Sequence, residues 1–197
     1  MIRAQNLSYT ANKNILLKPV SFSVAPGTMF CMIGSDGSGK TTLLRILAGF
    51  IRHYDGTVTI AGSSPSDFSG SFRFVPDTPV YMDDFSVKRY LLNVRQSSPD
   101  YIAGLEPSML NVFGISYDMP IRALSMSQNR SLQLIGAICS NPDILYLDEC
   151  TNLMEQKDAL RWVEILKKFS SRGLTVVTTA CGRNPLSTAC NSGVLLK

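Results

Sequence analysis

The chain has 197 residues, of which 45% are hydrophobic and 17% are charged; this length and composition predict one globular domain and exclude a largely disordered chain. The formal net charge of +4 is too small to indicate a nucleic-acid partner by itself. Five cysteines without a C-x-x-C pair and a single histidine, His53, argue against a zinc site and a disulfide framework.

The sequence predicts neither export nor a membrane crossing. Its first 25 residues contain no basic-then-apolar leader. The longest apolar stretch, residues 43–51, is nine residues long and contains Arg45, whereas a spanning helix needs about 20 apolar residues. We therefore expect reduced thiols in an intracellular compartment.

Hydrophobic patterning predicts strands that alternate with helices, which is typical of the α/β class. The expected elements, in chain order, are two strands in 2–24 joined by a turn at 11–14, a strand at 28–33, a helix at 41–50, strands at 56–61 and 72–75, a helical region at 77–141, a strand at 144–147, a helix at 157–169 and a strand at 174–179. The side chains of the helix at 157–169 expected to face inward are Leu160, Trp162, Val163 and Leu166.

A glycine-rich segment between a buried strand and a helix fits the phosphate-loop pattern G-x-x-x-x-G-K-[ST]. Its residues are Gly34, Ser35, Asp36, Gly37, Ser38, Gly39, Lys40 and Thr41. Glycines let backbone N–H groups converge on phosphates, and the helix N-terminus adds positive potential. We expect Lys40 to reach the β- and γ-phosphates and Thr41 to offer a hydroxyl to Mg²⁺. A glycine-rich turn with a surface lysine would carry the same letters, but the flanking elements favour a nucleotide site.

A second motif is the apolar strand at 144–147, which ends in Asp148 and Glu149. A carboxylate at the end of such a strand holds magnesium, directly or through water, so Asp148 is the candidate. Glu149 is the natural group to position an attacking water. The alternative is a strand followed by two solvated acids.

These motifs resemble the nucleotide-binding domain of ABC transporters, most strongly in GSDGSGKTTLLRILAG (34–49) and NPDILYLDECTNLMEQ (141–156). The resemblance covers nearly the whole chain. It implies a P-loop NTPase fold of the α/β class, with a RecA-like core built on a parallel sheet, a small antiparallel β-subdomain and a helical subdomain. The implied single domain, 1–197, divides into a core (1–76 and 142–197) and a helical subdomain (77–141).

The resemblance also implies a function, that of the ATP-binding subunit of a transporter. Two such domains close head to tail on two ATP molecules and move a transmembrane permease subunit at the inner face of the cell membrane. ATP and Mg²⁺ are the implied ligands, hydrolysis the implied activity, and no nucleic acid is implied. Thr42 would assist the phosphate loop, Asp148 would serve the magnesium, and Glu149 would be the general base.

Several positions depart from the family pattern. The signature LSGGQ is matched by Leu124-Ser125-Met126-Ser127-Gln128, so both glycines are lost and Ser125 is left as a donor toward the facing γ-phosphate. Asp77 replaces a glutamine; it can approach magnesium, but an ionised carboxylate donates no hydrogen bond. The switch histidine is matched by Cys181.

Smaller departures follow the acidic pair, where Cys150 replaces a proline, Met154 a leucine and Glu155 an aspartate. The adenine-stacking position is open between Tyr9 and Ala11.

Two functions stay open: a transport motor with slow hydrolysis, and a regulatory nucleotide-binding subunit with little turnover. A soluble ABC protein of repair or translation is disfavoured, because 197 residues leave no room for a coiled-coil insert or a second domain. Residues 81–85, including Tyr81 and Phe85, either face the membrane subunit or fold into the helical lobe. The transported substrate, its direction and the choice between homodimer and heterodimer are not written in the sequence.

Overall fold

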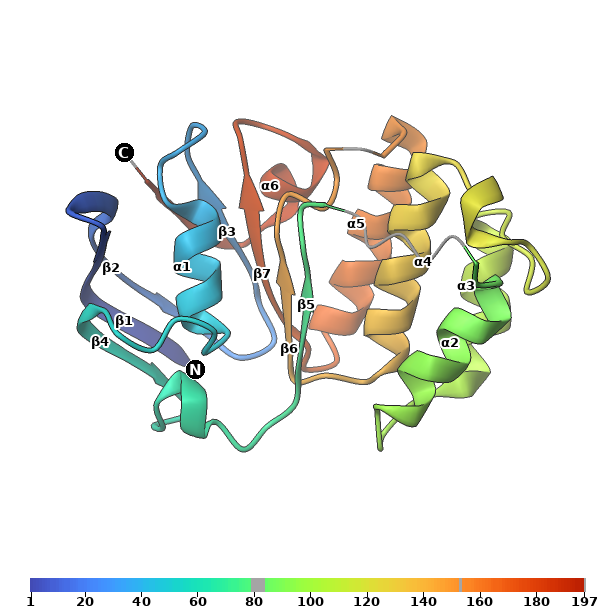
Figure 1. The fold of residues 1–197 in the computed structure, drawn as a ribbon, viewed down its shortest axis with the longest axis horizontal. Helices are drawn as coiled ribbons and strands as arrows, with labels where there is room; N and C mark the ends of the chain where they lie inside the picture. The colour runs from blue at the N-terminus through green and yellow to red at the C-terminus, as the bar shows by residue number, and fades with distance from the viewer. Residues whose placement is uncertain (79–83, 153, 197) are drawn as a thin grey trace.

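The computed structural model describes residues 1–78, 84–152 and 154–196. In Figure 1 an antiparallel sheet stands at one end of the molecule, a parallel sheet crosses its middle, and helices fill the other end. The three-stranded antiparallel sheet has the order β2-β1-β4. Its strands are β1 (Ile2–Ala11), β2 (Asn14–Val24) and β4 (Asp55–Ile60). Asn12 and Lys13, with φ of 50° and 64°, form the tight turn between the first two strands.

The second sheet has five strands in the order β5-β6-β7-β3-β8, and every neighbouring pair is parallel. The strands are β3 (Met29–Ile33), β5 (Phe72–Val75), β6 (Ile144–Leu147), β7 (Thr175–Ala180) and β8 (Ser192–Leu195). All residues of β6 and β7 are buried, as is typical of central parallel strands, although β7 contains three threonines.

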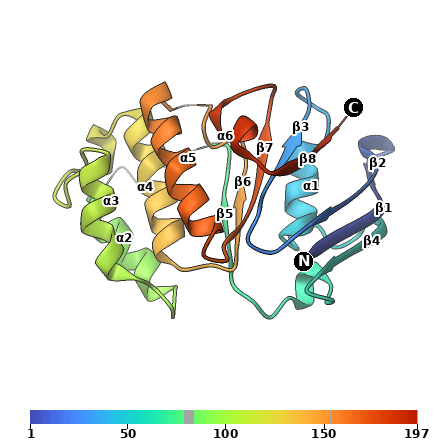
Figure 2. The ribbon, with the colours of Figure 1, turned by 180° about the vertical axis from the view of Figure 1, so that it is seen from behind.

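Helices cover both faces of the parallel sheet, as Figure 2 shows from behind. The helices of the described chain are α1 (Lys40–Leu47), α2 (Val87–Gln96), α3 (Glu106–Val112), α4 (Met126–Cys139), α5 (Gln156–Ser170) and α6 (Pro185–Ala189); α2 and α3 pack on α4 and not on the sheet (Figure 1). Short 3₁₀ turns lie at Pro65–Asp67, Ala103–Leu105 and Ile121–Ala123. No helix in the described part of the chain combines the length and apolar character that a bilayer crossing requires.

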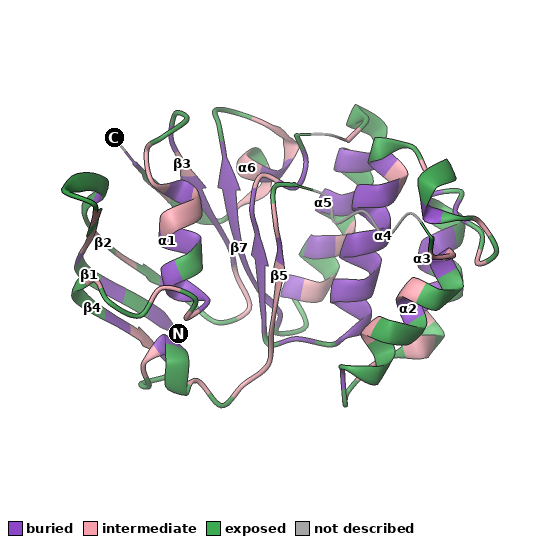
Figure 3. Ribbon diagram, viewed as in Figure 1, coloured by how far each residue is buried: buried purple, intermediate pink, exposed green. Residues whose placement is uncertain are grey.

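Two hydrophobic clusters form the core on opposite faces of this sheet. Side chains alternate along a strand, so Tyr146 of β6 packs with α1 and the antiparallel sheet, while Leu145 and Leu147 pack with α4 and α5. Figure 3 shows the buried inner faces of α4 and α5 beside the buried central strands. The end of the helical region at α4 therefore shares its core with the sheet.

The elements predicted from the sequence are present, with three corrections. Leu160 was expected to face inward, but it is 50% exposed. The buried positions of α5 include Ala159, Trp162, Val163 and Leu166, and Leu160 falls outside that stripe at 100° per residue. The other two corrections are α6 and β8, which the sequence patterning did not predict.

Candidate functional site

The phosphate loop connects β3 to α1 and depends on two left-handed glycines. Gly37 and Gly39 have φ of 78° and 93°, which favour residues without a side chain. A Cβ at Gly39 would lie 2.4 Å from the carbonyl oxygen of Leu16, so the loop packs directly on β2. Gly39 is also the N-cap of α1 and provides no side-chain cap. The first backbone N–H groups of α1 are thus available to an anion.

Lys40 is the buried cation of this loop. Its side chain is 5% exposed, and its Nζ donates to the carbonyl oxygens of Gly34 and Ser35 at 2.9 Å each. Nζ also lies 3.1 Å from Oε1 of Glu149. The ammonium group therefore joins the loop to the residue after the acidic strand.

A cavity of about 300 Å³ opens at this point. Its lining residues are Leu16, Asp36, Gly37, Gly39, Lys40, Thr41, Thr42, Asp77 and Glu149. The backbone of Gly34 and Ser35 contributes by holding Lys40. The hydroxyl of Ser38 is buried and has no hydrogen-bond partner among the described residues, but Ser38 lines a neighbouring cavity beside Leu195 and Leu196 and not this one.

Asp148 lies just under the cavity and is 1% exposed. It accepts a hydrogen bond from Thr179 Oγ1 at 2.7 Å. Burial raises the pKa of Asp148, the hydroxyls of Thr179 and Thr41 lower it, and the charges of Asp77 and Glu149 raise it further. A cation near these oxygens would offset that raised pKa.

The oxygen donors fit a magnesium ion shared with a phosphate. Within the described residues no three histidine, cysteine or acidic side chains form a metal cage by themselves. Mg²⁺ is typically bound through one or two carboxylates together with substrate phosphates. The hydroxyl of Thr41 and the carboxylates of Asp148 and Asp77 are donors of this class.

Glu149 adopts a left-handed backbone conformation, with φ of 43°, which is uncommon for a residue with a long side chain. Its backbone N–H donates to Thr179 Oγ1 at 2.8 Å, and its Oε2 accepts from the side chain of Asn152. Thr179 thus holds Asp148 and Glu149 together. Neither Thr179 nor Leu16 belongs to a motif that the sequence makes visible; the signal for Thr179 is its position at the end of a strand, like that of Asp148.

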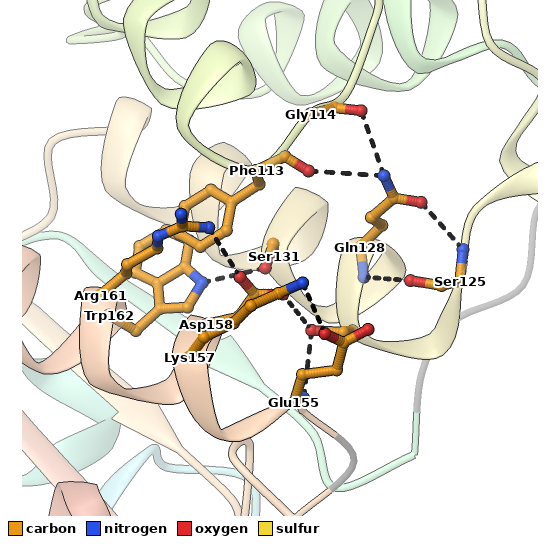
Figure 4. Close-up of polar contacts among 11 residues, drawn as sticks. Phe113, Gly114, Ser125, Gln128, Ser131, Glu155, Lys157, Asp158, Arg161 and Trp162 are labelled. Atoms are coloured by element: carbon orange, nitrogen blue, oxygen red, sulfur yellow. Dashed lines mark hydrogen bonds and ion pairs between the residues drawn. The ribbon is translucent and has the colours of Figure 1, made fainter.

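Ser125 lies at the start of α4, apart from the cavity lining. Figure 4 shows it paired with Gln128 in a capping box. Gln128 Nε2 also donates to the carbonyl oxygens of Gly114 at 3.1 Å and Phe113 at 3.4 Å. Within one chain, then, the structure does not bring Ser125 to the phosphate loop. Met126 follows at the first helical position and is 42% exposed.

The other altered positions separate into buried and exposed ones. Cys150 is 1% exposed, and burial raises the pKa of its thiol to about 12. Cys181 follows β7 and is exposed. Tyr9 is half-buried against the core cluster beside α1, and neither Tyr9 nor Ala11 lines the cavity.

The segment expected to meet a membrane partner is described only in part. Tyr81 and Met82 lie outside the described residues. Phe85 packs partly buried against the core, and the guanidinium of Arg89 lies 4.2 Å from the centre of its ring.

The family model for ABC transporters matches residues 17–152. An uncharacterized ABC transporter ATP-binding protein, YybJ of Bacillus subtilis, is 29% identical over 97% of this chain and 90% of its own length. A probable metal transport system ATP-binding protein of Thermotoga maritima is 30% identical over 90% of this chain and 73% of its own. The energy-coupling factor transporter ATP-binding protein EcfA1 of Fusobacterium nucleatum is 25% identical over 99% of this chain and 78% of its own length.

Solved structures share the fold. The ATP-binding subunit of an ABC transporter superposes with a TM-score of 0.87 at 20% identity, covering 100% of this chain and 85% of that one. A dimeric ATP-binding cassette bound to ADP and phosphate superposes with a TM-score of 0.82 at 20% identity, covering 100% and 94%. At this identity the likeness shows the fold alone.

Proposed function

This chain belongs to the ABC transporter family as an ATP-binding subunit, and from that premise we propose how its own residues bind ATP and promote its hydrolysis. The observation that carries the proposal is the position of Lys40. Its ammonium group is held at the cavity between two loop carbonyls and Glu149, and the free N–H groups of α1 face the same space. A triphosphate entering the cavity would meet this cation and the helix N-terminus together.

In this proposal the phosphates bind to residues 34–42. The phosphate-binding loop would be formed by the backbone of three glycines and by four polar residues: Gly34, Gly37, Gly39, Ser35, Asp36, Ser38 and Thr42. Thr41 and Asp148 would hold Mg²⁺, and Asp77, which lines the same cavity, would offer a further carboxylate. The ion would neutralise charge that develops on the phosphate oxygens. The raised pKa of Asp148 supports this assignment, because a buried carboxylate is costly without a cation.

Glu149 would act as the general base that orients an attacking water. Its carboxylate is bound by Asn152 and lies 3.1 Å from Lys40. When the phosphates take Lys40 as their partner, the carboxylate would be released from that ion pair. Thr179 keeps the Glu149 backbone in place throughout.

We propose that turnover is slow and that a second nucleotide-binding domain completes the site. Ser125 does not reach the cavity of its own chain, which supports its assignment to the ATP of a facing chain. Met126 would narrow that approach, Cys181 provides no imidazole, and Asp77 donates no hydrogen bond when ionised. Losing one polar group positioned at a transition state typically costs about 100–1000-fold in rate.

The same proposal assigns the partners and the domains. The partners are a transmembrane permease subunit at the cytoplasmic face of the membrane and a second nucleotide-binding domain, identical or different, without nucleic acid. The domain 1–197 would comprise a core (1–76 and 142–197) and a helical subdomain (77–141).

A second candidate is a regulatory subunit that binds ATP and hydrolyses little. The specific observation in its favour is Met126, whose side chain occupies the first turn of α4 where close approach to a facing phosphate would be needed.

Steady-state ATP turnover by the complex purified through this chain separates the two candidates, with its co-purifying membrane subunit identified and Glu149→Gln as the control. We expect turnover that collapses in the control. Tight retention of ATP with negligible turnover in both proteins would favour the regulatory subunit. Absence of any ATP binding would contradict both.

A further inference from the structure

The first turns of α4 and α5 are joined by the hydroxyl of one buried residue, Ser127. It is 3% exposed. Its Oγ donates to Asp158 Oδ2 at 2.6 Å and accepts the backbone N–H of Glu155 at 3.3 Å. Glu155 is the N-cap of α5, and Asp158 is the third residue of that helix. Figure 4 shows these two residues opposite Ser125 and Gln128 of α4.

The N-terminus of α5 is therefore capped indirectly, through a side chain of the neighbouring helix α4. In an ordinary capping box the side chain at the third helical position accepts the N-cap N–H directly. In α5 the N-cap side chain makes no capping bond, and its carboxylate pairs instead with Lys157 at 2.8 Å. The hydroxyl of Ser127 stands between the Glu155 N–H and the Asp158 carboxylate. We call these three groups the Ser127 relay.

The acidic end of the relay is itself fixed. Asp158 is 6% exposed, and its Oδ1 lies 3.1 Å from NH1 of Arg161. Each carboxylate oxygen thus has its own donor. Removing the hydroxyl of Ser127 would leave a buried carboxylate oxygen and a backbone N–H without this partner, which is the costly way to lose a hydrogen bond.

The Ser127 relay joins two segments of the chain. In the proposed function these segments belong to two different ATP sites. Glu155 closes the loop that begins at Glu149, the proposed base of the chain's own ATP site. Ser127 lies two residues after Ser125, which is proposed to face the ATP of a second chain. We propose that Ser127 is a positioning residue whose relay fixes the start of α4 relative to the Glu149 loop, so that the two sites of a dimer move together. This inference rests on the proposed function.

The experiment has a matched control in the same helix. Ser131 is fully buried, and its hydroxyl accepts from Trp162 Nε1 at 3.1 Å. Ser131→Ala therefore removes an equally buried hydroxyl that does not reach the loop.

Self-association with MgATP is measured by sedimentation velocity on the full chain carrying Glu149→Gln, which retains ATP. We expect Ser127→Ala to weaken ATP-dependent association about tenfold, with the Kd of the monomer for MgATP unchanged. We expect Ser127→Thr, which keeps a hydroxyl, and Ser131→Ala to associate as the parent does.

Hydrogen exchange on the nucleotide-free chain tests the relay without reference to function. The amide of Glu155 should exchange about tenfold faster in Ser127→Ala than in the parent, and at the parent rate in Ser131→Ala. If Ser127→Ala does not fold, Asp158→Asn, which keeps one acceptor oxygen without the charge, should give a smaller acceleration.

Each outcome tests a different part of the proposal: the relay, the positioning role of Ser127, or the dimer. Unchanged exchange at Glu155 would overturn the relay. Faster exchange with unchanged association would overturn the positioning role while the proposed function stands. MgATP binding without self-association in any variant, the parent included, would overturn a head-to-tail homodimer, and with it the coupling of two identical sites.

Discussion

At the residue scale, the ammonium group of Lys40 has close oxygen neighbours before any nucleotide binds: the carbonyls of Gly34 and Ser35 and the carboxylate of Glu149 lie within 3.1 Å, and the carboxylate of Asp36 lies at 3.9 Å. A buried cation without such partners would be strongly destabilising. The contacts hold the amine at the cavity, and the Glu149 contact is the one that a phosphate can replace.

Lys40→Ala should therefore weaken MgATP binding more than it weakens the fold. Charge-assisted contacts contribute roughly 1.5–3 kcal/mol each, so the loss of one corresponds to about a tenfold to hundredfold rise in Kd. Isothermal calorimetry measures it, with Lys168→Ala, a substitution at an exposed position of α5, as the control. Unchanged affinity in Lys40→Ala would contradict the phosphate-loop assignment.

Cys150 gives a prediction about alkaline stability. Burial raises the pKa of its thiol from 9.0 to about 12, so between these values the folded chain keeps a proton that the unfolded chain releases. Its contribution to the free energy of unfolding is present below pH 9 and is lost as the pH rises toward 12. Denaturant titrations should show stability falling more steeply from pH 9 to 11 in the wild type than in Cys150→Ala, by on the order of 2 kcal/mol. Parallel pH curves would refute this.

At the element scale, periodicity predicted the strands and helices that pack on a large apolar face. β3 and β6 are continuous apolar runs, and α1 carries buried leucines at helical spacing. The strand β8 escaped prediction because it is four residues long, contains Gly193 and is mostly exposed. It is a strand because it pairs with β3 in register from Phe30 to Ile33, which tertiary structure provides and local sequence does not.

Gly193→Ala tests that pairing. A Cβ at this position would lie 2.5 Å from the carbonyl oxygen of Cys31, a backbone atom of a central strand that has little room to move. We expect β8 to separate from β3 and the free energy of unfolding to fall by about 1–3 kcal/mol. Gly104→Ala is the control, since its added Cβ meets nothing within 4 Å. Chemical denaturation of both variants decides, and equal stabilities would contradict the close approach.

At the scale of the whole molecule, the sequence predicted the parts of the site that are contiguous. The phosphate loop and the acidic pair are short contiguous motifs whose residue types specify their local backbone geometry. Leu16 and Thr179 were not predictable that way, because they reach the site from β2 and β7. The register Leu147↔Thr178 puts Thr179 beside Asp148, a neighbourhood that exists only after the sheet has formed.

The folded arrangement also divides the altered family positions by what each side chain does. Met126 is 42% exposed, and Cys181 is exposed as well. Ser127 is different, because its buried hydroxyl joins α4 to α5. We therefore expect glycine at position 127 to remove a buried hydrogen bond between two helices, whereas position 126 is partly exposed.

From this difference we predict the order of three variants in ATP turnover by the purified complex. Met126→Gly with Cys181→His should raise kcat by at least about tenfold, since positioned polar groups at a transition state are typically worth 100–1000-fold and close approach to the facing phosphate is opened. Adding Ser127→Gly should return part of that gain, because the relay is lost and glycine loosens the first turn of α4. Thermal unfolding measured in parallel should place the triple variant below the double. A triple variant faster than the double would show that the start of α4 works best when it is free of α5, and no gain in either would show that these positions do not limit the rate.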